Sequence, residues 1–80
     1  MKKSIYTEQR RRLTTLLREM RMESGLTQTE LAKRIGRPQN VISRFENDER
    51  RVDILEIREI CLALGITFEK FVRRLEKALK

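Results

Sequence analysis

Apolar residues recur along the chain at the spacing of amphipathic α-helices. The first run places Leu13, Leu16, Leu17 and Met20 on one face, and i, i+1, i+4 triplets follow at residues 31, 32 and 35 and at residues 41, 42 and 45. No stretch alternates apolar and polar residues as a half-buried strand does. The pattern therefore predicts an all-α fold. We expect its five helices at about residues 7–24, 28–35, 39–47, 54–64 and 68–79.

Capping residues mark the start of three of these helices. Thr27 precedes Glu30 by three positions, and Asp53 precedes Glu56 in the same way, which is the spacing of a capping box. Thr67 supplies a cap without an acidic partner. Glycines suited to a left-handed helix end follow the apolar runs at positions 25, 36 and 65. The helix at 39–47 is the least well capped, because no Ser, Thr or Asp precedes it.

One face of the fourth predicted helix is expected to lie in the core. The residues of that face are Leu55, Ile57, Ile60, Cys61 and Leu64. Glu56 and Glu59 on the same helix are expected on a solvated face. Cys61 is the only cysteine, and its apolar neighbours favour a buried small hydrophobe over a reactive thiol.

The helix expected at 39–47 is far more polar on one side than its packing requires. At about 100° per residue, the polar side chains fall within an arc of roughly 140°. They are the amides of Gln39, Asn40 and Asn47, the hydroxyl of Ser43 and the guanidinium of Arg44. The opposite side carries Val41, Ile42 and Phe45. A helix anchored by one face with such groups on the other suits the reading of base edges in a DNA major groove.

Composition limits the remaining possibilities. Eighty residues suit one small domain with a modest core, which we place at residues 1–80, with residues 1–6 as a flexible N-terminal arm and 66–80 as a closing helix. No long apolar stretch or signal-peptide core is present, so a cytoplasmic protein is expected. With one cysteine and no histidine, no intrachain disulfide, metal site or cofactor is expected.

Positive charge is concentrated outside the fourth predicted helix. The net charge of the chain is +7. Residues 1–25 carry +4, residues 26–47 carry +2, residues 48–65 carry −2 and residues 66–80 carry +3. A polyanion partner fits this total, and the fourth helix is a poor choice for the surface that meets it.

An ordered set of residues resembles the helix-turn-helix of the lambda Cro-like repressor family, also called the xenobiotic-response-element (XRE) family. The resemblance covers about residues 10–75, and the matching positions are Gly25-Leu26-Thr27-Gln28, Glu30-Leu31-Ala32, Gly36, Ile42-Ser43-Arg44, Glu46, Arg50 and Ala63-Leu64-Gly65. Asp48 departs from the pattern where glycine is usual, and Val52 departs where proline is usual. Asp tolerates a left-handed backbone better than most residues, so the first departure is mild.

The resemblance implies roles for residues around the predicted turn. Gln28, at the start of the second helix, would bind a DNA phosphate, as the free N–H groups and dipole of a helix start favour an anion. Asn47 and Arg50 match positions that contact phosphate in relatives. The family pattern also pairs Glu46 with an arginine of the first helix, here Arg21, in a structural ion pair. Weaker phosphate candidates, for which a solvated role is equally open, are Arg10–Arg12, Arg37 and Arg51.

Gln39 and Asn40 would reach deepest into the groove, where an amide can pair with adenine N6 and N7 together. Arg44 can bond guanine or a phosphate, and Ser43 can do either weakly. The alternative is an ordinary solvated helix face. Val41 either fills the core or lies against a thymine methyl. The sequence does not determine which bases are read.

The last predicted helix carries two leucines beyond what one small core needs, Leu75 and Leu79. They either belong to a fraying end or form a two-fold dimer contact. A dimer would place two recognition helices about 34 Å apart on a palindromic operator.

These observations favour a sequence-specific regulator of transcription that binds double-stranded DNA, acting as a homodimeric repressor by promoter occlusion. The alternative is an antitoxin or protein-interaction module that uses the same fold to bind a partner protein such as a toxin. An enzyme is disfavoured, because the chain lacks histidine, a glycine-rich phosphate loop and a carboxylate set near a nucleophile.

Overall fold

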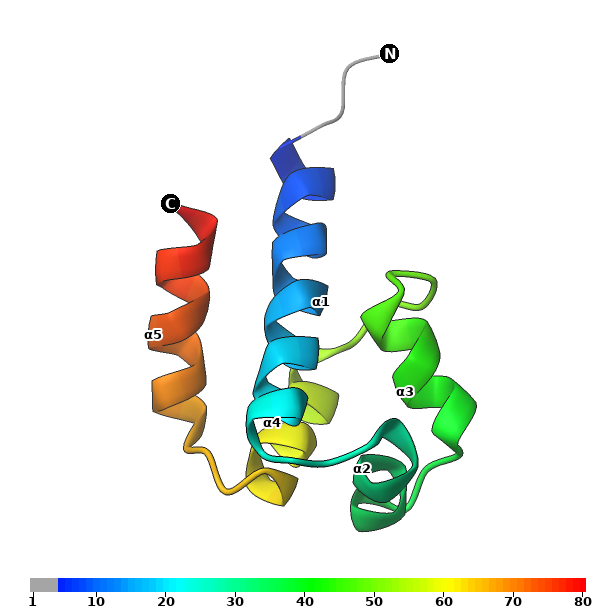
Figure 1. Cartoon of the computed structure of the whole chain (residues 1–80). Coiled ribbons are helices and arrows are strands. Elements are labelled where there is room, and N and C mark those ends of the chain that lie inside the picture. Colours follow the sequence, from blue (N-terminus) through cyan, green and yellow to red (C-terminus); the bar gives the residue numbers. More distant parts are fainter. Residues whose placement is uncertain (1–4) are drawn as a thin grey trace.

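The computed structural model describes residues 5–80, and these residues form five helices without a strand (Figure 1). The helices are α1 (Ile5–Glu23), α2 (Gln28–Ile35), α3 (Gln39–Glu46), α4 (Ile54–Ala63) and α5 (Phe68–Leu79). The predicted all-α, five-helix fold is confirmed. α1 begins two residues before the predicted boundary, so Ile5 and Tyr6 of the expected arm are helical, while residues 1–4 of that arm lie outside the described residues.

The predicted capping boxes set the starts of α2 and α4. Thr27 Oγ1 accepts a hydrogen bond from the Glu30 amide at 3.1 Å, and the Glu30 carboxylate accepts one from the Thr27 amide at 2.9 Å. In the same way, the Asp53 carboxylate accepts a hydrogen bond from the Glu56 amide at 2.9 Å, and the Glu56 carboxylate accepts one from the Asp53 amide at 3.0 Å. The hydrogen bond from the Thr27 amide lowers the pKa of Glu30 below its ordinary value, because the bond favours the charged carboxylate.

Asp48 adopts the left-handed conformation that the family pattern assigns to glycine. Its φ is 56°, and it is the only non-glycine residue with positive φ in residues 5–80. The Asp48 carboxylate lies 2.9 Å from a guanidinium nitrogen of Arg10 on α1. The short polar side chain tolerates this backbone, and its ion pair fastens the loop after α3 to the first helix.

One apolar core joins all five helices. α1 packs between α5 on one side and α3 on the other, while α2 packs against α3 and α4 (Figure 1). The largest side chains buried to less than 2% exposure come from every helix: Met20, Leu31, Ile42, Phe45, Cys61 and Phe71. Burial raises the pKa of the Cys61 thiol, so the prediction of a buried small hydrophobe at Cys61 is confirmed.

Two predictions for α4 are wrong. Leu55 is 69% exposed, because Ile57, Ile60 and Cys61 define the core side of the helix and Leu55 lies on the other side. Glu56 is only 8% exposed instead of solvated. Its carboxylate accepts hydrogen bonds from Arg37 at 2.6 Å and Arg50 at 3.5 Å. Cationic partners from distant parts of the chain thus make burial of this carboxylate tolerable, whereas Glu59 is exposed as expected.

α5 closes the fold along α1. Arg74 of α5 donates two parallel hydrogen bonds to the Glu23 carboxylate, at 2.8 and 2.9 Å. These bonds lower the pKa of Glu23 from its ordinary value. Within residues 5–80, no helix combines the length and the apolar character needed to cross a membrane.

Candidate nucleic-acid interface

α3 is held by one face and leaves its polar face open. Ile42 and Phe45 are buried at 1% and 2% exposure. Gln39, Asn40 and Arg44 are exposed. Pro38 begins the helix without a side-chain cap, in agreement with the sequence. The helix therefore projects two amides and a guanidinium from a rigid base.

The remaining polar-face residues lie nearer the edges of α3. Ser43 is half-buried, and Asn47 is the exposed residue that ends the helix. Val41 is half-buried against the core cluster, which agrees with the first of its two alternatives.

A chain of hydrogen bonds links the start of α3 to the start of α2. Gln39 Nε2 donates to Gln28 Oε1 at 2.7 Å, and Gln28 Nε2 donates to Glu46 Oε1 at 3.0 Å. Within residues 5–80 the Gln39 side chain makes no other hydrogen bond, so its carbonyl oxygen and second N–H remain available to a ligand. The sequence did not predict this contact, since it depends on the angle between two helices.

The Glu46 carboxylate also accepts hydrogen bonds from Arg21 at the base of the site. Arg21 Nε donates to Glu46 Oε2 at 2.7 Å and Nη2 donates to Oε1 at 3.0 Å, while Nη1 donates to the Leu26 carbonyl at 2.7 Å. The two side chains are only 11% and 4% exposed. The bidentate pair thus joins α1 to α3, and its carboxylate holds Gln28 as well.

Arg37 and Arg50 flank α3 and share the Glu56 carboxylate. Arg37 lies in the turn before α3, and Arg50 lies in the loop after it, with its guanidinium 5.1 Å from the centre of the Phe45 ring. Their side chains keep 31% and 37% exposure, so both retain donors that face solvent. Sequence reasoning missed Glu56 as the group that fixes them. A carboxylate in a capping box followed by a buried isoleucine is a weak signal for such a role.

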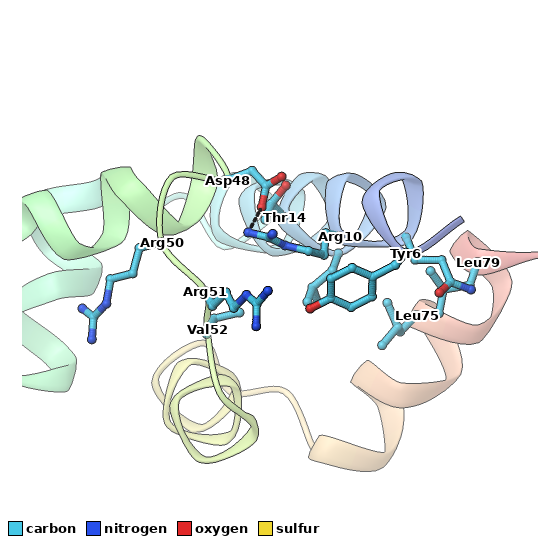
Figure 2. A pocket seen from close by; sticks show the side chains of 11 residues that line it. Tyr6, Arg10, Thr14, Asp48, Arg50, Arg51, Val52, Leu75 and Leu79 are labelled. Carbon is cyan, nitrogen blue, oxygen red and sulfur yellow. Dashed lines mark ion pairs between the residues drawn. The ribbon is translucent and has the colours of Figure 1, made fainter. Parts of the chain in front are cut away.

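The other basic candidates have partners within the subunit. Arg10 pairs with Asp48, and Arg51 lies 5.8 Å from the centre of the Tyr6 ring (Figure 2). Arg11 pairs with Glu8 at 3.5 Å, and Arg12 donates to the carbonyls of Ala78 and Lys80. Arg10 and Arg51 thus tie α1 to the loop after α3, Arg12 ties it to the end of α5, and the Arg11 pair lies within α1.

Leu75 and Leu79 line a hollow between α1, the loop after α3 and α5 (Figure 2). Both side chains are half-buried within their own subunit, and the hollow measures about 210 Å³. Pockets for drug-sized ligands are larger, about 300–1,000 Å³. A dimer contact at these leucines stays a prediction. No cluster of three metal-binding side chains occurs among residues 5–80.

Two short helices across a glycine turn, with the second held rigidly and its amides exposed, define a helix-turn-helix DNA-binding protein. The chain belongs to the XRE-type helix-turn-helix family of DNA-binding transcription regulators: the model of the helix-turn-helix family HTH_3 matches residues 17–71. No curated protein matches the chain.

Solved structures agree with this assignment. An XRE-family like protein from Pseudomonas syringae pv. tomato DC3000 is 40% identical, with a TM-score of 0.84 over 91% of this chain and 89% of that one. The controller protein C.Esp1396I, solved as a tetramer with its natural 35-base-pair operator, is 24% identical, with a TM-score of 0.82 over 89% of this chain and 93% of that one. The clp gene regulator ClgR from Corynebacterium glutamicum is 24% identical, with a TM-score of 0.77 over 90% and 92%. The similarity to C.Esp1396I and to ClgR shows that these two proteins share the fold of this chain.

Proposed function

We propose that this protein is a sequence-specific repressor that binds a palindromic operator as a homodimer and blocks promoter access. The observation that carries the proposal is the contact between Gln39 and Gln28 beside exposed Asn40 and Arg44. An amide that is already oriented loses less conformational freedom when it binds.

Gln39 is the proposed adenine-reading residue. Its carbonyl oxygen and remaining N–H form the acceptor and donor pair that adenine N6 and N7 require in the major groove. Asn40 follows it on the same polar face, and Arg44 lies one turn farther along the helix. We assign Arg44 to guanine or to a flanking phosphate, and Ser43 to a weaker contact beside them.

Gln28 has a double role in the proposal. It orients Gln39 through its oxygen, and it stands at the first position of α2, where backbone N–H groups favour a phosphate. Asn47 and Arg50 extend the phosphate contacts beyond the other end of α3. Such contacts fix the register of the protein on DNA and leave sequence choice to the base contacts.

The oligomer and the mode of repression complete the proposal. Two copies of α3 on one operator would double the contacts of a single small domain. The fold shared with a controller protein solved on its operator supports this arrangement. In this proposal the bound dimer represses by occluding the promoter.

The experiment is selection of bound sites from random duplex DNA, followed by titration of the selected site and of scrambled DNA. Gln39→Ala should weaken binding to the selected site about 5- to 150-fold, the equivalent of about 1–3 kcal/mol per bidentate contact. Binding to scrambled DNA should change little, because phosphate contacts remain. Glu69→Gln on exposed α5 is the control. Equal affinity of the wild type for selected and scrambled DNA would contradict the proposal and favour a protein-interaction module.

A further inference from the structure

The hollow between α1, the loop after α3 and α5 is lined partly by apolar and partly by charged side chains (Figure 2). Its apolar lining consists of half-buried side chains from three separate segments, namely Leu13, Val52, Leu75 and Leu79. Tyr6 and Arg51 line it as well. We call this space the α1–α5 hollow. A concave apolar surface with a few polar groups beside it is the usual composition of a small-molecule site.

The volume of the α1–α5 hollow limits the size of its ligand. The hollow measures about 210 Å³. A cavity of about 150 Å³ lined by Leu, Ile and Phe binds benzene, so the hollow has room for one ring with a small substituent. Ligands of drug size need more space.

Positive charge exceeds negative charge at the edge of the hollow. Arg10 and Arg51 each place a guanidinium 5.8 Å from the centre of the Tyr6 ring. Of the residues in 5–80 that line the hollow, only Asp48 carries a carboxylate, and it pairs with Arg10. The guanidinium of Arg51 lies on the Tyr6 side of the loop, whereas that of Arg50 lies on the other side (Figure 2). Arg51 thus supplies a cation without a counter-charge beside an apolar lining.

We propose that the α1–α5 hollow binds a small organic carboxylate that carries one apolar ring. The ring packs against Leu13, Leu75 and Leu79, and the carboxylate pairs with Arg51, whose planar guanidinium can donate to both oxygens. This site goes beyond the proposed function. None of its residues belongs to the polar face of α3, so the site does not depend on DNA recognition.

Other occupants fit only half of the hollow. A phosphate of DNA would use the charge of Arg51 but leave the apolar lining in water. A second subunit would cover the lining, but it would also enclose a guanidinium for which this chain supplies no counter-charge, which is costly. A ligand with both a ring and a carboxylate satisfies the apolar lining and the cation together.

NMR titration of the full ¹⁵N-labelled chain tests the proposal, with benzoate as the probe. Benzoate should shift amide signals around Leu13, Val52 and Leu79 together, because these residues meet only at the hollow. A Kd of about 1 mM is expected for so small a ligand. Benzyl alcohol keeps the ring without the charge, and acetate keeps the charge without the ring. Each should bind at least about 10-fold more weakly than benzoate.

Two variants separate the contributions of charge and apolar contact. Arg51→Gln should weaken benzoate binding about 10-fold and leave benzyl alcohol binding unchanged, because only the carboxylate loses its partner. Leu79→Ala should weaken the binding of both. Arg51 is exposed, so its substitution should preserve the fold. Arg73→Gln is the matched control, because it removes an equal charge from an exposed position of α5 that does not line the hollow.

Three results would overturn the proposal. The first is the absence of shifts around the hollow at about 20 mM benzoate, well above the expected Kd. The second is equal benzoate affinity of Arg51→Gln and the wild type. The third is a change from dimer to monomer in sedimentation of Leu79→Ala, which would assign the hollow to a contact between subunits.

The same protein distinguishes this proposal from the proposed function. A wild type that prefers its selected DNA site but does not bind benzoate contradicts the ligand site alone. A wild type that binds benzoate in the hollow but has equal affinity for selected and scrambled DNA contradicts sequence-specific repression alone.

Discussion

Glu46 is the residue on which the geometry of the recognition surface depends most directly. Its carboxylate accepts from Arg21 and from Gln28, and Gln28 in turn accepts from Gln39. A carboxylate this deeply enclosed tolerates burial only because its partners neutralise it. The side chain of Gln28 therefore links the buried carboxylate of Glu46 to the exposed amide of Gln39.

Glu46→Gln should destabilise the fold by about 3–5 kcal/mol, because Arg21 would remain buried without a counter-charge. Urea denaturation followed by circular dichroism measures the change. Arg18→Ala, an exposed change on α1 three residues before Arg21, serves as control, and its free energy of unfolding should stay within about 0.5 kcal/mol of the wild-type value. If Glu46→Gln lowered the free energy of unfolding by less than about 1 kcal/mol, the site would be more hydrated than the structure indicates.

Residues on α4 show where sequence patterns stop being sufficient. Ile57, Ile60 and Cys61 fit a core face, and all three are buried. Leu64 packs half-buried against the core as predicted, but Leu55 is exposed, because its direction depends on how the helix is rotated against α2 and α5. Glu56 looked solvated because its partners, Arg37 and Arg50, are 19 and 6 positions away. Local periodicity carries no information about such pairs.

At the scale of elements, predicted boundaries are best where capping chemistry is explicit. α2 and α4 begin where their capping boxes place them. α1 begins two residues before its predicted boundary. The angle between α2 and α3 brings Gln28 to Gln39. It could not be predicted from the sequence, because it depends on how the whole core packs.

The Arg74–Glu23 bridge gives the contact between α5 and α1 a pH dependence. The pKa of Glu23 in the folded protein is lowered below 4.5, chiefly by hydrogen bonds from Arg74. A lowered folded-state pKa gives a stabilisation that is complete above the unfolded value and disappears as pH falls through the folded one. The docking of α5 should thus weaken only in acid below pH 4.5.

Carboxyl NMR titration should place the Glu23 midpoint below 4.5, and Arg74→Gln should return it toward that ordinary value. Glu30 provides an internal control, because its own lowered pKa comes chiefly from Thr27 and not from Arg74. A Glu23 midpoint that does not respond to Arg74→Gln would contradict the bridge in solution.

For the whole molecule, the distribution of charge matters more than its total. Residues 48–65 carry −2, and the other segments of the chain each carry an excess of positive charge, so the surface formed by those other segments suits a polyanion better. Each phosphate that a protein neutralises contributes about −0.9 to the slope of log affinity against log salt.

Arg50→Gln should make that slope shallower by about one per subunit and leave the preferred sequence unchanged, because a phosphate contact positions without reading bases. Affinity measured from 50 to 200 mM salt, about the range in which this effect is large, gives the slope. Lys77→Gln removes the same charge from the exposed side of α5, away from the proposed DNA interface, and should leave the slope unaltered. Equal slopes for Arg50→Gln and the wild type would remove Arg50 from the interface.

Cys61 has a practical consequence for such measurements. Its side chain is 0% exposed, and its pKa is raised, so at neutral pH it is a neutral, enclosed thiol that reacts slowly with maleimides. A cysteine introduced at an exposed position would then be the single reactive thiol of the chain. Spin labels or fluorophores could be attached there without first removing the native sulfur, and the spacing of two subunits on an operator could be measured directly.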